Sequence, residues 1–138
     1  MKANFIFGML LTLFVLGGCS SPPPSDRFLN STLALLPADG KGDPEVLHLR
    51  ATDLYNIFDL HVTKKWQRVH ENSWKMVING KDPATHRTSR MVITLATDPK
   101  ADRTVIVKSI TEAGKEYPPN MIAEMIRQLD QSFIPKKQ

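Results

Sequence analysis

The stretch Trp74-Lys75-Met76-Val77-Ile78-Asn79-Gly80 decides the fold class of this chain. Its large apolar residues stand at every second position, which is the period of a β-strand, and it stops at Asn79-Gly80, a dipeptide typical of tight turns. Two further stretches, 91–96 and 104–111, are rich in Val, Ile and Leu and end at turn-forming residues. Three consecutive strands with short polar connections predict an antiparallel meander, because parallel neighbours would need longer crossovers.

The C-terminal part of the chain predicts a helix that begins after Asn120, its expected N-cap, and ends before Pro135. The apolar residues on one face of this helix are Ile122, Met125, Ile126, Leu129 and Phe133. The polar residues expected on the opposite, exposed face are Glu124, Arg127 and Asp130. Such a helix buries its apolar face on the open face of a sheet. The sequence therefore predicts a small α+β domain of two layers, an antiparallel β-meander packed by a C-terminal helix.

The segment between residues 45 and 69 combines a strand with an ambiguous stretch. Residues 46–50 form a short apolar strand candidate, and Thr52-Asp53 can cap a turn of helix that runs through Tyr55. Over residues 57–69 the apolar positions fit both the period of a strand and the four-residue spacing of a helix. The β-branched pair Val62-Thr63 favours a strand there, and a helix is the alternative.

Residues 28–44 consist of a short apolar segment and a turn region rich in Gly, Asp and Pro. Phe28, Leu29, Leu33 and Leu36 approximate one face of a short helix, which must bury its apolar side somewhere. We expect this segment to pack on its own domain. The alternative is that it docks into a groove of a partner protein.

The N-terminus has the plan of a secretory signal. Lys2 precedes an apolar run from Phe5 to Leu16, which is too short to cross a bilayer core that needs about 20 apolar residues. The run ends in Leu16-Gly17-Gly18-Cys19, which contains the only cysteine of the chain. This tetrapeptide resembles the lipobox of bacterial lipoproteins. The rest of the chain shows no resemblance to a known family.

The resemblance implies a covalent lipid anchor at Cys19. In bacterial lipoproteins the thiol carries diacylglycerol, the chain is cut before the cysteine, and the new amine can receive a further acyl chain such as palmitate. Several acyl chains make membrane attachment effectively permanent. In the same family an Asp after the cysteine favours the inner membrane, so Ser20 implies the outer membrane, with the domain facing the periplasm. The inner membrane is the less favoured location.

The chain therefore divides into four parts. Residues 1–18 are the expected cleaved signal peptide. Residues 19–27, rich in Ser and Pro, cannot bury apolar surface and favour an extended form, so they predict a tether. Residues 28–44 are the short apolar segment and turn region, and residues 45–138 are the single α+β periplasmic domain. The mature chain is long enough for one domain of ordinary size and not for two.

Charge is concentrated in one part of the chain. The formal net charge of +4 is too mild for a nucleic-acid-binding protein. Residues 61–90, however, contain seven Lys and Arg residues against only Glu71 and Asp82. The candidate residues for binding a ligand or partner are Lys64, Lys65, Trp66, Arg68, Arg87 and Arg90. The alternative, which we favour for the Trp66 region, is that the ring belongs to the core and its neighbours form a solvated strand face.

The sequence carries no recognised catalytic motif. It lacks a Gly-x-Ser-x-Gly elbow, a His-Glu-x-x-His pair and a second cysteine. Its four histidines are spaced so that no two share a helical turn, and we expect neither a metal nor a cofactor. A small periplasmic enzyme would require unrelated residues, such as Asp59, His70 and Glu71, to converge in a cleft.

The leading hypothesis is a non-enzymatic, membrane-anchored lipoprotein that acts as a protein-binding or assembly component of a bacterial envelope, secretion or conjugation machine. The first alternative is a protein that binds an anionic envelope ligand, either a lipid, lipopolysaccharide or peptidoglycan, through the basic stretch 61–90. We expect a membrane and an envelope protein as partners, and no nucleic acid.

Overall fold

The computed structural model describes residues 22–133 except 38, 59–61 and 82–83. Along the chain its elements are α2 (Asp26–Leu29), β1 (Thr32–Leu35), β2 (Glu45–Arg50), α3 (Ala51–Ile57), β3 (Val62–His70), β4 (Ser73–Lys81), β5 (Thr88–Thr97), β6 (Thr104–Glu112), β7 (Lys115–Glu116) and α4 (Pro119–Phe133).

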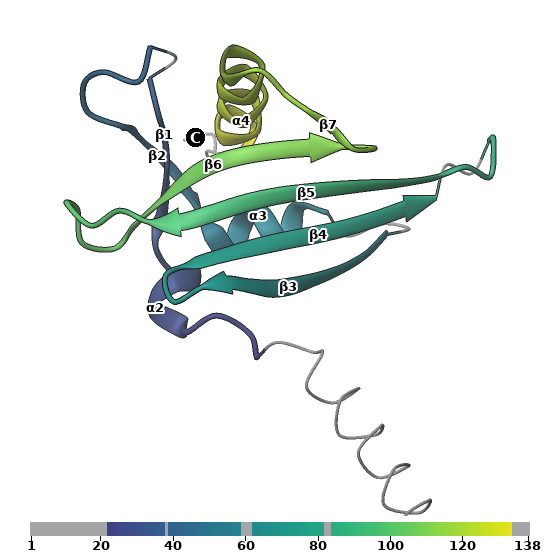
Figure 1. Ribbon diagram of the computed structural model, residues 1–138, viewed down its shortest axis with the longest axis horizontal. Helices are drawn as coiled ribbons and strands as arrows, with labels where there is room; N and C mark the ends of the chain where they lie inside the picture. Colours follow the sequence, from purple (N-terminus) through teal and green to yellow (C-terminus); the bar gives the residue numbers. More distant parts are fainter. Residues whose placement is uncertain (1–21, 38, 59–61, 82–83, 134–138) are drawn as a thin grey trace, which may run out of the picture.

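All seven strands belong to one sheet, in which the order is β2-β1-β6-β5-β4-β3 and β7 pairs with β6 (Figure 1). Strands β4 to β6 form the predicted meander of consecutive antiparallel neighbours, and β3 extends it by pairing antiparallel with β4. The one parallel pair joins β1 to β6, over residues 32–35 and 104–107. Helix α4 packs on the sheet against β2 and β6. The prediction of a small α+β domain with an antiparallel meander and a C-terminal helix is therefore confirmed.

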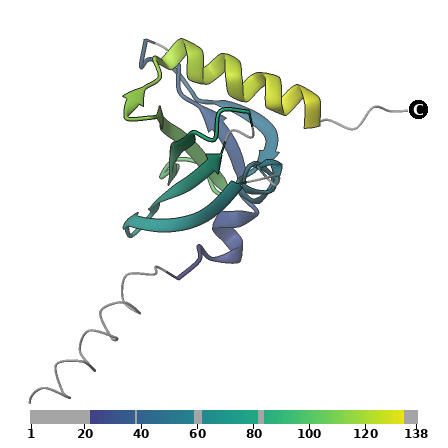
Figure 2. The same ribbon diagram turned by 90° about the vertical axis from the view of Figure 1, so that its right-hand side faces the viewer.

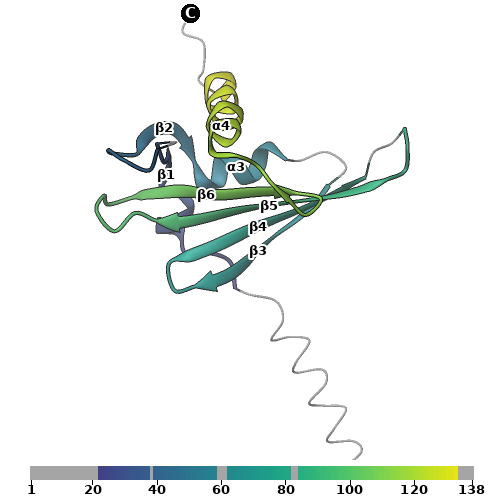
Figure 3. The same cartoon turned by 45° about the horizontal axis from the view of Figure 1, so that its top comes forward.

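The core lies on one face of the sheet, between the strands and the helices α3 and α4 (Figures 2 and 3). Leu54 of α3 and Ile126 of α4 are fully buried and belong to the same core cluster as Met76 and Ile93 of the central strands. Among the residues that the structure describes, no helix covers the broad opposite face (Figure 3). The molecule therefore has one covered and one uncovered sheet face.

Residues 28–36 do not form the expected helix. Helix α2 ends at Leu29, and residues 32–35 form β1, which lies between β2 and β6. Leu33 and Leu35 belong to the core, and Ala34, which has the opposite parity, is also buried, so the run lacks a helical period. Phe28 also joins the core. The expectation that this segment packs on its own domain is confirmed.

The packed domain begins inside the segment expected as a tether. Pro24 is buried, and Ser25 is the N-cap of α2, where its Oγ accepts a hydrogen bond of 3.3 Å from the N–H of Phe28. Arg27 forms an ion pair with Asp102 in the connection between β5 and β6. The predicted signal peptide and Cys19 lie outside the described residues.

The ambiguous stretch after residue 50 contains both a helix and a strand. Helix α3 ends at Ile57 and β3 begins at Val62, so the predicted strand is confirmed from Val62 onward. The helix begins at Ala51, slightly before the expected cap. Its cap comes from within the first turn, because Asp53 Oδ2 accepts a hydrogen bond of 3.0 Å from the N–H of Arg50.

The dipeptide Asn79-Gly80 does not form the predicted turn. Strand β4 continues through it to Lys81, and Gly80 pairs with Val62 on one side and Ser89 on the other. Pairing on both sides outweighs the local preference of the dipeptide. A Cβ on Gly80 would lie 3.2 Å from Val62 Cγ1, so the glycine allows close packing rather than a reversal of the chain.

Helix α4 begins at Pro119, one residue before the expected N-cap Asn120. The carbonyl of Pro118 accepts hydrogen bonds of 3.0 Å from the N–H groups of Met121 and Ile122. Proline suits the first helical position because its fixed backbone angle matches the helix. A residue at this position has no acceptor within the helix for an N–H, so the missing N–H of proline costs no hydrogen bond.

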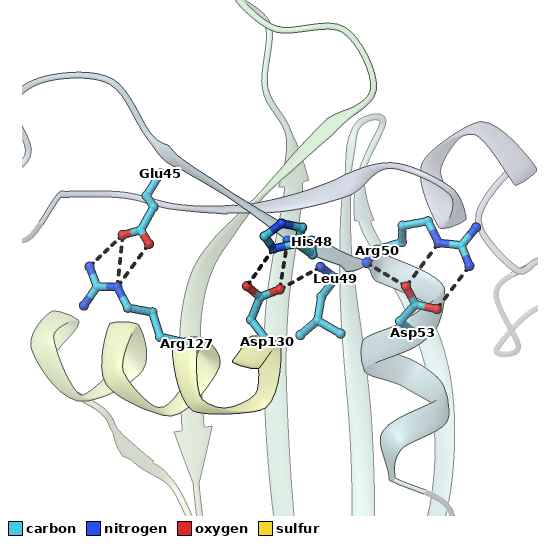
Figure 4. A network of polar contacts seen from close by, with 7 residues as sticks. All are labelled: Glu45, His48, Leu49, Arg50, Asp53, Arg127 and Asp130. Carbon is cyan, nitrogen blue, oxygen red and sulfur yellow. Dashed lines mark hydrogen bonds and ion pairs between the residues drawn. The ribbon is translucent and has the colours of Figure 1, made fainter. Parts of the chain in front are cut away.

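Asp130, expected on the exposed face of α4, is buried, with 6% of its surface exposed. Between its pairs with Thr32 and Ala34, β2 has three residues opposite one residue of β1, which is a β-bulge. Figure 4 shows Asp130 beside this bulge, where its Oδ1 accepts hydrogen bonds from the N–H groups of His48 at 2.8 Å and Leu49 at 2.9 Å. The carboxylate supplies the acceptors that the bulge removes from the strand ladder.

Two ion pairs flank the Asp130 contact in Figure 4. Arg127 of α4 binds Glu45 of β2, with 2.7 Å between Nη2 and Oε1, and this hydrogen bond holds the pKa of Glu45 below its usual value. Arg50 binds Asp53 with 3.1 Å between Nε and Oδ2. Together these contacts join β2 to both helices and fix the position of α4 on the sheet.

Candidate binding surface

Strands β3, β4 and β5 lie side by side in the sheet and contain no Asp or Glu. Their cationic residues are Lys64, Lys65, Arg68, Lys75, Lys81 and Arg90. The two acidic residues of the basic stretch, Glu71 and Asp82, stand in the connections between these strands. Three of the seven strands of the described sheet thus carry positive charge only.

The strand register distributes these cations between the two faces. Met76, Trp74 and Ile78 of β4 belong to the core, so the alternate residues of β4 face the uncovered side. Lys65 pairs with Val77 and Arg90 pairs with Asn79, which places both on that same side. The residues that we call the outer basic face are Lys65, Lys75, Lys81 and Arg90.

The outer basic face consists of two diagonal pairs of like charges. Lys65 lies opposite Val77, two residues from Lys75, and Lys81 lies opposite Thr88, two residues from Arg90. Diagonal neighbours have their side-chain bases about 7–8 Å apart, which is within the Debye length at physiological ionic strength, so the two like charges of each pair repel each other. Within the described part of the chain, no acidic side chain forms an ion pair with any of the four.

The centre of this face is closed rather than hollow. Val77 of β4 is 1% exposed and Ile106 of β6 is 8% exposed, so both are buried although no described helix covers this face. Neither residue belongs to the main core cluster, which agrees with their place on the face opposite the core. No aromatic residue of β3, β4 or β5 has the parity of this face. It is therefore a flat surface of lysine and arginine over small and β-branched residues.

Trp66 lies on the opposite, core side of β3, within an aromatic cluster. Its ring stacks on Tyr55 of α3 with 5.1 Å between centroids, and meets Phe28 edge-on at 6.0 Å. Phe28 also packs near Trp74, at 6.3 Å. Trp66 is only partly buried, so its ring closes the edge of the core where α2 and α3 meet β3.

Lys64 and Arg68 accompany Trp66 and are engaged with their own domain. Lys64 Nζ lies 4.4 Å from the Tyr55 ring centroid and donates a hydrogen bond of 2.7 Å to the Tyr55 carbonyl. The Arg68 guanidinium lies 5.9 Å from the Trp74 ring and donates to the carbonyls of His70 and Glu71. Both cations therefore hold the aromatic cluster and the β3–β4 turn.

The predicted candidate residues thus occupy three places. Lys65 and Arg90 lie on the outer basic face, Lys64, Trp66 and Arg68 lie on the core side, and exposed Arg87 lies in the connection between β4 and β5. The residues that the sequence interpretation missed are Lys75 and Lys81. The period of two along β4 was sufficient to find them, because both share the parity of Val77.

Two cavities lie at opposite ends of the domain. The larger, of about 690 Å³, lies between α2 and the turns β3–β4 and β5–β6, and both Arg68 and Asp102 line it. The hydrogen bond from Arg27 holds the pKa of Asp102 below its usual value. The smaller, of about 170 Å³, lies where the end of β1 meets the start of α4, and its lining includes Leu36 and Ala123.

Catalysis, metal binding and membrane spanning are the remaining possibilities for the described residues. His70 and Glu71 are exposed neighbours at the β3–β4 turn, whereas Asp59 lies outside these ranges. There, no group of three or more His, Cys, Asp or Glu side chains is placed to hold a metal ion. None of the helices in these ranges is long and apolar enough to cross a bilayer. No protein family model, no curated protein and no solved structure matches this chain.

Proposed function

We propose that this protein is a non-enzymatic bacterial lipoprotein, anchored through lipid at Cys19, that binds another envelope protein during assembly or operation of a membrane-spanning machine. The anchor lies in the outer membrane and the domain faces the periplasm. The resemblance of Leu16-Gly17-Gly18-Cys19 to a lipobox supports the anchor. The distribution of surface features relative to the N-terminal residues supports the binding role.

The observation that carries the binding role is the position of the smaller cavity. The described N-terminal residues lie beyond β3, on the opposite side of the molecule from α4 and the connection that follows β1 (Figures 1 and 2). The cavity is lined mainly by apolar residues, among them Leu36 and Pro37 after β1 and Pro119 and Ala123 of α4, and its lining also includes Lys108 and Glu116. An anchored domain would therefore present this apolar groove away from its membrane.

The surroundings of the groove suit an apolar segment of a partner protein. Leu36 is 41% exposed, and Met121, adjacent in the chain to the lining residue Ile122, is 50% exposed. Large apolar side chains exposed beside a concave surface are typical of protein interaction sites. Helix α4 and β1 are held rigidly by the core, so the groove is formed before binding.

Site-specific photo-crosslinking in intact cells tests this function. A photoreactive residue at position 121 should give a discrete adduct with one envelope protein, and Leu36→Asp should abolish it, because a carboxylate in the groove rejects an apolar segment. A probe at Gln128, exposed on α4 outside the groove, is the matched control. An adduct that is equally strong from position 128, or unchanged by Leu36→Asp, would contradict the proposal.

A second candidate function is the binding of an anionic envelope ligand through residues 61–90. The absence of acidic residues from β3, β4 and β5 favours it. The cations of the outer basic face form two pairs of like charges that repel each other, and an anionic ligand would offset that repulsion. The two functions use different surfaces, so one domain can perform both.

A further inference from the structure

We propose that the outer basic face docks on the anionic phospholipids of the membrane that holds the anchor, and so fixes the orientation of the domain. This inference rests on the proposed lipid anchor at Cys19. It adds a second, electrostatic contact to the covalent one. The ligand is a surface of phospholipid headgroups rather than a single bound molecule.

The place of β3 beside the N-terminal residues supports a lipid surface as the occupant. Pro22 and Pro23 line the same cavity as Arg68 and Trp74, at the β3–β4 end of the sheet. In Figures 1 and 3, β3 is the strand next to these N-terminal residues, and α4 is on the far side of the sheet. Cys19 is only three residues before Pro22, so at most about 11 Å of extended chain can separate Pro22 from the anchored residue.

The composition of the face also favours lipid headgroups over an acidic protein. The centres of protein interfaces contain aromatic, Met and Arg side chains and are depleted of Lys. The outer basic face has three lysines, one arginine and no aromatic residue, and Val77 at its centre exposes almost no surface to a partner. Lysine presents a compact charge on a flexible stem, which suits a fluid layer of phosphates better than a fixed array of carboxylates.

Electrostatics sets the size of the effect. A Lys or Arg close to an anionic bilayer changes the docking equilibrium about fivefold, the equivalent of about 1 kcal/mol, and the effect is confined to the Debye length. Because the anchor already holds the domain at the surface, docking of the face is an intramolecular step that costs only orientational freedom of the domain. A few such charges are therefore enough to keep the face on the lipid for most of the time.

The single cysteine allows a direct test on the mature chain, from Cys19 to Gln138. The chain is coupled through Cys19 to a maleimide lipid in nanodiscs of pure phosphatidylcholine, or of phosphatidylcholine with about a third of phosphatidylglycerol. Acylation of lysines by a water-soluble reagent is then followed residue by residue by mass spectrometry. We expect Lys65, Lys75 and Lys81 to react several-fold more slowly on the anionic discs, and Lys41 and Lys115 to react equally on both.

Charge reversal distinguishes a specific face from net charge. The double variant Lys65→Glu/Arg90→Glu should lower the docked-to-free ratio at least about twenty-five-fold, fivefold for each lost charge, and remove the protection of Lys75 and Lys81. Lys41→Glu/Lys115→Glu changes the net charge equally, at exposed sites outside this face, and should preserve the protection. Thermal unfolding of both variants confirms that they are folded.

Three results would overturn the proposal. These are equal lysine reactivity on the two kinds of disc, equal loss of protection in both double variants, and protection by soluble polyglutamate without protection by anionic discs. The last result would assign the face to an acidic protein. Lipidation of Cys19 is measured separately, from the mass of the N-terminal peptide of the protein made in cells. An absent lipid anchor is therefore distinguished from an outer basic face that does not dock.

Discussion

The buried carboxylate of Asp130 provides the sharpest test of the fold. In Asp130→Ala, the N–H groups of His48 and Leu49 lose their acceptor, and Leu49 is fully buried. A hydrogen bond to a charged group contributes about 1.5–3 kcal/mol, and a buried donor left without a partner costs about 1–3 kcal/mol. Alanine recovers up to about 0.7 kcal/mol through its better helix propensity. We therefore expect the free energy of unfolding to fall by about 2–4 kcal/mol.

Equilibrium unfolding in urea at neutral pH measures this change, and the m-value should stay constant. Asp130→Asn retains one acceptor oxygen and should cost less, about 1 kcal/mol. Glu124→Ala, on the exposed side of the same helix, is the matched control and should stay within about 0.5 kcal/mol of the parent protein. The role given to Asp130 would be refuted if Asp130→Ala cost no more than Glu124→Ala.

Three further outcomes follow from the structure and the proposed anchor. Trp66→Ala should lower the free energy of unfolding by about 2 kcal/mol, which is less than the loss expected for a fully buried tryptophan. The variant should also lose the near-ultraviolet circular dichroism that the stacking of Trp66 on Tyr55 produces. An unchanged free energy of unfolding would contradict this packing. The lowered pKa of Glu45 means that its pair with Arg127 contributes stability above the ordinary pKa of a glutamate, and that this contribution is lost as pH falls through the lower pKa of the folded state. Glu45→Gln should remove that part of the acid dependence in urea unfolding, and because both side chains are about half exposed, the difference at neutral pH should stay within about 1 kcal/mol. Cys19→Ser should abolish incorporation of labelled palmitate in cells, and label retained by the variant would contradict the lipid anchor.

Elements with one buried and one exposed face were predictable from the sequence. Strands β4 and β5 were found from the alternation near Met76 and Ile93, and α4 from the stripe of Ile122 and Ile126. In these elements burial imposes the period of the element on the sequence itself. Strand β6, in which residues 104–107 are all buried, was found instead from its continuous run of Val and Ile. No long-range information is needed to read such a pattern.

Elements buried on both faces, or shaped by a distant neighbour, were not predictable in this way. Strand β1 has no alternation because Leu33, Ala34 and Leu35 are all covered. Gly80 suggested a turn because its closeness to Val62 is invisible along the chain. Asp130 suggested an exposed residue because the bulge that it caps lies 81 positions away, at Leu49.

The candidate binding surface was likewise predictable only in part from the sequence. The sequence showed that residues 61–90 are basic, with acidic residues only at Glu71 and Asp82. It did not show that Lys65 and Arg90 share a face from which Lys64 is excluded, because that depends on the register of three strands. Side-chain period is local, whereas register is a property of the pairing.

By itself, the sequence determined the fold class, the amphipathic elements and the uneven distribution of charge, because these follow from composition and from periods within single segments. Only the tertiary structure decided that β1 enters the sheet beside β6, that Asp130 is buried at the bulge of β2, and that four cations meet on one uncovered face. The physical reason is that each of these features depends on hydrogen bonds or charges between segments far apart in the chain, and such contacts leave no periodic pattern in either segment.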